Sequence, residues 1–186
     1  FSVFNADAIK DINIIKGGMP AQYGGRLSSV LDISMKDGNN KKYELDGGIG
    51  LLSSRATVQG PIVKNKSSFI VSGRRTYIDV LSKPFLNNED NAFSGSGYYF
   101  YDLTTKVNYR LSDRDKLFLS GYFGRDVFSF SNSDNNIAIE IPWGNATTSL
   151  RWNHLFNDKL FMNTSLIFSD YRFEFNIGQQ DFELKI

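Results

Sequence analysis

Charged side chains recur in segments of this sequence that otherwise read as β-strands. Four are basic and two are acidic: Arg55, Arg74, Lys106, Arg151, Asp102 and Asp126. Cations in such positions can bind an anionic substrate, or they can pair with carboxylates of a neighbouring segment. We favour pairing, because a charged wall that faces a polar partner needs ion pairs to offset its desolvation.

Two glycine pairs, Gly17-Gly18 and Gly24-Gly25, superficially suggest a phosphate-binding loop. No Gly-Lys-Ser/Thr follows them, and their spacing is not that of a dinucleotide fingerprint. We therefore interpret both pairs, with the adjoining Arg26, as tight turns in which φ is positive. No nucleotide is expected.

The remaining reactive residue types are scattered. His154 is the only histidine and there is no cysteine, which is too little for a metal site or a catalytic triad. Asp113, Asp115 and Asp134 lie in expected turns or loops, where carboxylates cap turns or hold calcium; we favour capping. We expect no catalytic residue, no metal and no cofactor.

Composition narrows the class of protein. The 186 residues are 41% hydrophobic and 15% aromatic with a net charge of +1, so the chain is neither disordered nor a generically basic nucleic-acid binder. The sequence contains no run of about 18 apolar residues, so it predicts no membrane helix. A membrane β-strand, however, needs only about 9 to 11 residues of alternating character. Because the chain begins with Phe, we expect an internal or processed part of a longer protein.

Alternation is the main structural signal. Residues 98–111 place Leu103, Val107 and other apolar residues on one parity, opposite Asp102 and Lys106 on the other. Residues 145–155 and 160–175 repeat the pattern. The segment Leu117–Phe130 does so less cleanly, because Phe118 falls among the polar positions.

Connections alternate between short and long. Short polar turns are expected at 64–66, 112–115 and 157–158, and long polar loops at 82–97 and 131–141. This alternation is typical of a transmembrane β-barrel in the bacterial outer membrane. Aromatic residues near the strand ends fit the girdles of such barrels: Tyr99, Tyr101, Tyr109 and Trp152. A soluble sandwich or lipocalin-like barrel is the alternative, but the strands exceed the usual length of about 5 to 6 residues.

The first forty residues differ in kind. A short helix over residues 5–12, capped by Asn5 or Asp7, is expected to precede a strand at 13–16. A second turn or helix at 19–23 and a strand at 28–34 complete a small α+β unit.

Two segments carry a family resemblance. The segment from Ile14 to Gly38, IIKGGMPAQYGGRLSSVLDISMKDG, looks like the closing part of the plug domain of TonB-dependent outer-membrane transporters of the kind common among Bacteroidota. The segment from Arg55 to Tyr77 resembles the first barrel hairpin of that family. The resemblance covers roughly residues 1 to 80.

The resemblance implies an all-β membrane protein. Residues 1–40 would be the C-terminal part of the plug, and residues 41–186 the first six strands and, at 181–186, the start of the seventh of a 22-stranded antiparallel transmembrane β-barrel. It further implies import energised by TonB, with ExbB and ExbD, through an N-terminal region outside this chain. Other expected partners are outer-membrane lipids, a surface lipoprotein, and a small-molecule, peptide or glycan substrate, but no nucleic acid. A non-transporting scaffold subunit with the receptor fold is the alternative.

Overall fold

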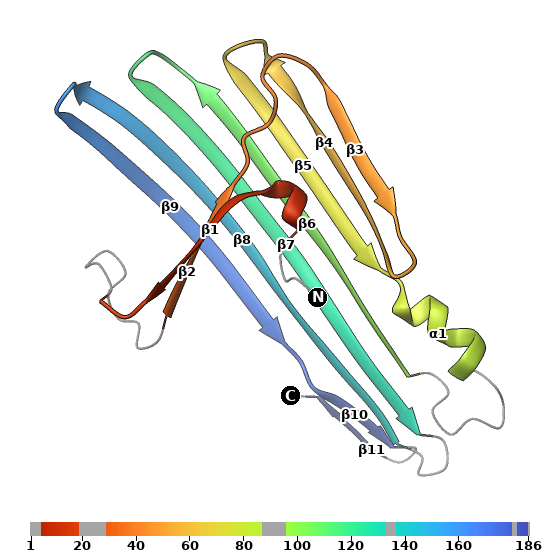
Figure 1. The fold of residues 1–186 in the computed structure, drawn as a ribbon. Coiled ribbons are helices and arrows are strands. Elements are labelled where there is room, and N and C mark those ends of the chain that lie inside the picture. Colours follow the sequence, from red (N-terminus) through yellow and green to blue (C-terminus); the bar gives the residue numbers. More distant parts are fainter. Residues whose placement is uncertain (1–4, 19–28, 87–95, 133–136, 180–181, 186) are drawn as a thin grey trace.

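One antiparallel sheet of nine strands dominates the computed structural model (Figure 1), which describes residues 5–18, 29–86, 96–132, 137–179 and 182–185. The strands are β3 (Glu44–Ile49), β4 (Ser53–Val63), β5 (Ser67–Thr76), β6 (Gly97–Arg110), β7 (Asp115–Asn132), β8 (Ile137–Asn157), β9 (Leu160–Phe173), β10 (Asn176–Gln179) and β11 (Phe182–Lys185). Their order is β11-β10-β8-β7-β6-β5-β4-β3, with β9 also paired to β8. Neighbours in the chain are mostly neighbours in space, and the described sheet is open.

The pairing register confirms the predicted alternation. Lys106 of β6 lies opposite Ser120 of β7, which lies opposite Ser149 of β8. One residue away, Val107, Leu119 and Leu150 form the adjacent row, which points to the other side. In these rows polar and apolar residues of β6, β7 and β8 therefore collect on opposite faces of the sheet.

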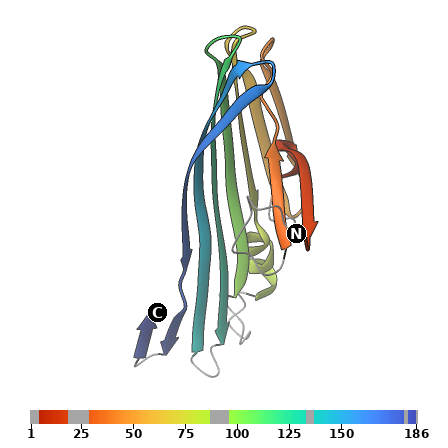
Figure 2. The ribbon, with the colours of Figure 1, turned by 90° about the vertical axis from the view of Figure 1, so that its left-hand side faces the viewer.

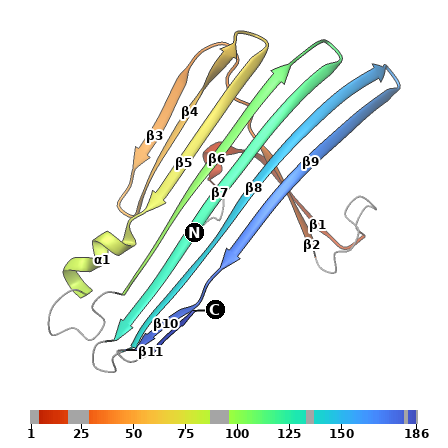
Figure 3. The same cartoon turned by 180° about the vertical axis from the view of Figure 1, so that it is seen from behind.

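A small two-stranded unit covers one of these faces. We call it the N-terminal hairpin: the 3-10 turn η1 (Ala6–Ala8), β1 (Ile9–Lys16) and β2 (Ser29–Met35). It lies on one side of the sheet only (Figure 2), and we call that side the inner face. The view from behind shows the uncovered outer face (Figure 3).

The helix predicted over residues 5–12 was wrong beyond its first turn. Asn5 does cap it, since Asn5 Oδ1 accepts a hydrogen bond of 3.1 Å from the backbone N–H of Asp7. The strand, however, begins at Ile9 rather than Asn13, because a run rich in isoleucine favours extended backbone and β2 offers it a partner. The turn or helix predicted at 19–23 lies outside the described residues.

The three short turns are confirmed, but both long loops are shorter than predicted. Helix α1 (Ile78–Leu86) occupies the start of the loop predicted at 82–97. The strands β7 and β8 run far into the loop predicted at 131–141, ending at Asn132 and resuming at Ile137. Pairing between two long strands stabilises the extended backbone at their ends, even where the polar sequence alone predicts a loop.

The strand count also needs correction. The expected six strands and start of a seventh correspond to β4 to β9 and β11, so β3 and β10 were missed. Two glycines weaken the strand signal of β3, and β10 is only four residues long.

Burial is reversed relative to a water-soluble sheet. Among the most buried side chains, at 7% exposure or less, are Thr57, Ser72, Asp102, Thr104 and Lys106, all on the inner face. The outer face instead exposes apolar side chains such as Val71 (37%), Leu103 (44%) and Leu150 (44%). The sheet thus presents apolar residues outward and buries polar ones under the hairpin.

Candidate functional site

Two ion pairs join the N-terminal hairpin and the residues just after it to the inner face. Arg55 Nη1 of β4 lies 3.2 Å from Asp7 Oδ1, and Lys106 Nζ of β6 lies 2.7 Å from Asp37 Oδ1. Lys106 also donates a hydrogen bond of 2.9 Å to the backbone carbonyl of Met35 at the end of β2. Since the Lys106 side chain is only 8% exposed, its charge depends on these acceptors.

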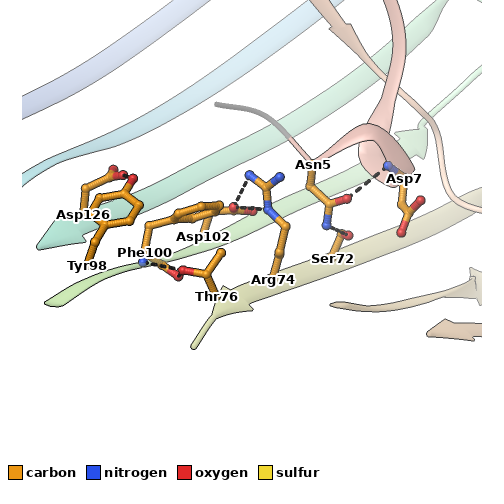
Figure 4. Close-up of polar contacts among 9 residues, drawn as sticks. All are labelled: Asn5, Asp7, Ser72, Arg74, Thr76, Tyr98, Phe100, Asp102 and Asp126. Atoms are coloured by element: carbon orange, nitrogen blue, oxygen red, sulfur yellow. Dashed lines mark hydrogen bonds and ion pairs between the residues drawn. The ribbon is translucent and has the colours of Figure 1, made fainter. Parts of the chain in front are cut away.

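A buried hydrogen-bond chain lies between these pairs. Asn5 Nδ2 donates to Ser72 Oγ of β5 over 2.7 Å (Figure 4). Ser72 Oγ in turn lies 2.7 Å from Thr57 Oγ1 of β4. Asn5 is 3% exposed, Thr57 4% and Ser72 0%. The same Asn5 side chain therefore caps η1 and ties it to two strands.

Next along the inner face, Arg74 of β5 is bonded to Asp102 of β6. Arg74 Nε and Nη2 lie 2.8 Å and 2.6 Å from Asp102 Oδ2, and the two side chains are 14% and 2% exposed. The guanidinium also lies 4.8 Å from the centroid of the Phe100 ring. Arg74 and Asp102 are direct register partners, so the strand pairing itself brings the two charges together.

A cavity of about 440 Å³ adjoins this cluster, between the hairpin and β6 to β9. Its sheet side carries aromatic, amide, hydroxyl and carboxylate groups, among them those of Thr104, Tyr122, Asp126, Trp143, Asn145 and Tyr171. Asp126 Oδ1 accepts a hydrogen bond of 2.7 Å from Tyr98 Oη, whose ring stacks on Trp143 with centroids 6.4 Å apart. No lysine or arginine lines this cavity among the described residues.

Phe118, the apolar exception in a polar parity, has a specific environment. Arg151 lies 4.6 Å and Lys106 5.6 Å from the centroid of its ring. The aromatic face thus stabilises two inner-face cations. Arg151 has no carboxylate partner among the described residues, unlike Arg55, Arg74 and Lys106.

The structure divides the candidate residues into three groups. Arg55, Arg74, Asp102 and Lys106 lie together beside the hairpin, with Asp126 at the adjoining cavity and Arg151 towards the short turns. Gly17 and Gly18 have φ of 73° and 55°, as a tight turn requires. The second turn, Gly24, Gly25 and Arg26, lies outside the described residues.

Sequence reasoning missed Asn5 and Ser72 as contact residues and Tyr98 as the partner of Asp126. Parity alone puts Ser72 on the inner face, but nothing in the sequence says which polar wall residue meets the capping asparagine. That pairing spans 67 positions in the chain.

Within the described part of the chain, no cluster of three or more His, Asp or Glu side chains could hold a metal ion. No helix in that part is long and apolar enough to cross a membrane. No protein-family model, curated protein or solved structure matches this chain.

Proposed function

We propose that this chain is part of a TonB-dependent transporter of the bacterial outer membrane, comprising the end of its plug and the first strands of a 22-stranded barrel. The observation that carries the proposal is the reversed burial: polar and charged side chains packed under the hairpin, apolar ones exposed on the opposite face. Exposed apolar side chains are unfavourable in water. A lipid bilayer against the outer face and a polar plug against the inner face would make the same arrangement favourable.

Strand length supports the same reading. The strands β6 to β9 have 14, 18, 21 and 14 residues, more than the 9 to 11 that cross a bilayer. On the outer face of β6, Tyr101 and Tyr109 are separated by eight residues, roughly 26 Å at 3.3 Å per residue. That spacing fits aromatic residues at the two borders of an apolar band about 25 Å tall.

The N-terminal hairpin takes the part of the plug. The contacts of the hairpin and its flanking residues with the inner face include ion pairs and hydrogen bonds, which water can replace when the hairpin moves. In the proposed mechanism a substrate binds near the plug, and TonB, energised through ExbB and ExbD, pulls the plug away from the wall. The chain itself performs no bond chemistry.

The proposal includes the remaining partners. Outer-membrane lipids would contact the outer face, and a surface lipoprotein could cover the loop end. The substrate is a small molecule, peptide or glycan.

The test locks the hairpin to the wall. Asn5→Cys and Ser72→Cys place two thiols where side chains now lie in hydrogen-bond contact, in a chain without other cysteines. In the full-length protein, joining them by a disulfide or a short bis-thiol reagent should abolish TonB-dependent uptake, and reduction of the disulfide should restore it.

The control locks two wall strands instead, through Ser120→Cys and Ser149→Cys, register partners on β7 and β8 that do not line the cavity beside the hairpin. Uptake should survive that link. Uptake unaffected by the Asn5–Ser72 link, or cells indifferent to TonB for every candidate substrate, would leave the receptor-fold scaffold as the better explanation.

A further inference from the structure

A second hollow, of about 280 Å³, lies at the short-turn end of the sheet, away from the hairpin. It lies between β7, β8, β9 and the turn before β7, and its polar lining is Asp113, Arg114, Lys116, Asn153, His154 and Asn163. None of these residues contributes to the site described above.

The two cations that line this hollow form no ion pair with a described carboxylate, because the lining carboxylate, Asp113, is bonded to Arg110. Lys116 lies directly opposite Arg110 in the β6–β7 register, and like charges in opposed positions destabilise a sheet. Arg110 is bonded to Asp113 at 2.6 Å, and the other nearby carboxylate, Asp115, is bonded to His154 at 2.6 Å. Lys116 and Arg114 have no carboxylate partner within the described residues.

Two amide residues on neighbouring strands line the same hollow. Asn153 of β8 is the register partner of both Lys116 of β7 and Asn163 of β9. Asn153 Oδ1 is shielded from solvent and accepts no hydrogen bond from the described part of the chain. A buried acceptor without a donor is unfavourable, so a ligand that supplies the donor would be stabilised there.

We propose that this hollow binds a phosphate group. Phosphate provides anionic oxygens for Lys116 and Arg114 and, when singly protonated, a P–OH donor for Asn153 Oδ1. Sulfate offers the same shape and charge without that donor at neutral pH. The inference goes beyond the transport proposal and does not depend on it, since the hollow is formed only by β7, β8, β9 and the turn before β7.

The experiment measures binding of inorganic phosphate to the purified full-length protein by calorimetry, at neutral pH and constant ionic strength in chloride. Removing both charges with Arg114→Gln and Lys116→Gln should weaken binding by about 100-fold, taking about tenfold for each charge-assisted contact. The matched control is Lys41→Gln with Lys64→Gln, two exposed cations near the same end that do not line the hollow. Binding unchanged in the first variant, or weakened equally in the control, would overturn the site.

Two further arms sharpen the assignment. Asn153→Asp keeps the side-chain size but adds a negative charge, and it should abolish phosphate binding while circular dichroism reports an intact sheet. Sulfate binding as tightly as phosphate would overturn the role of Asn153. A short-chain phosphatidic acid identifies the source: tighter binding than inorganic phosphate assigns a lipid headgroup, and equal binding assigns free phosphate.

Discussion

The inner faces of β5 and β9 both carry polar side chains, but those side chains have different environments. Under the hairpin, β5 is largely buried and its Ser72 and Arg74 are fully engaged. On β9 almost every residue is exposed, including Ser165 and Ser169 of the polar parity. The comparison teaches that alternation determines which way a side chain points, whereas the covering segment determines whether it becomes part of a packed site.

Charge follows the same division. The cations beside the hairpin have carboxylate partners, whereas Arg151 and Lys116, towards the short turns, have none among the described residues. Covered charges should therefore matter far more for stability than uncovered ones.

The largest expected effect breaks the covered Arg74–Asp102 pair. Arg74→Leu leaves the Asp102 carboxylate, 2% exposed, without its cation, and should lower the free energy of unfolding by about 3 to 5 kcal/mol. Arg172→Leu removes an exposed pair with Asp170 on β9 and should cost less than about 1 kcal/mol. Urea unfolding of the full-length protein in detergent measures both. Similar losses would contradict the division, and Arg74→Leu with Asp102→Leu should regain much of the stability.

The next effect compares the two faces within the uncovered region. Leu150→Arg puts a charge on the outer face of β8 and should cost about 2 to 4 kcal/mol at the bilayer midplane, lowering the amount assembled in the outer membrane. Ser149→Arg points to the inner face and should assemble normally. The measurement is the amount of each variant in outer-membrane fractions. Equal amounts would reject the assignment of faces.

A smaller effect is expected from the hydrogen bonds of the hairpin. Asn5→Ala removes both the cap of η1 and the bond to Ser72, and should cost about 1 to 2 kcal/mol. Thr147→Val removes an exposed contact with Ser169 on β9, where changes should stay within about 0.5 kcal/mol. Protease cleavage of the hairpin should rise only in the first variant, and equal cleavage of the two would count against a docked hairpin.

The smallest effect is a pH dependence at the short-turn end. The hydrogen bond from His154, followed by those from Ser112 and Trp152, lowers the pKa of Asp115. Because the folded pKa is depressed, the resulting stability is present above the unfolded value of about 3.9 and is lost as the pH falls through the folded value. Carboxylate NMR titration should show the Asp115 midpoint rising in His154→Phe, and an unmoved midpoint would exclude His154 as the main cause.

The sequence predicted the long strands, their facing and the three short turns, because local alternation and turn chemistry specify them. It failed where long-range pairing overrides local preference, as for β3 with its two glycines and for the ends of β7 and β8. The candidate site followed a similar division. Charged positions such as Lys106 were identifiable from parity, but their partners Asp7 and Asp37 depend on how the hairpin docks. Phe118 breaks the alternating pattern, and nothing in the sequence explains it; in the structure its ring contacts the cations of Lys106 and Arg151.

The contacts of the hairpin also bear on the order in which the chain can assemble. Its ion pairs and its side-chain hydrogen bonds to the sheet reach β4, β5 and β6, which follow in the chain directly after β3. Contacts between segments close in the chain form at a lower entropic cost than distant ones. The hairpin can therefore dock on a partly formed sheet before β8 and β9 are added. In the proposed barrel, the hairpin would thus take its position while the sheet is still open, and later strands would extend the sheet past it.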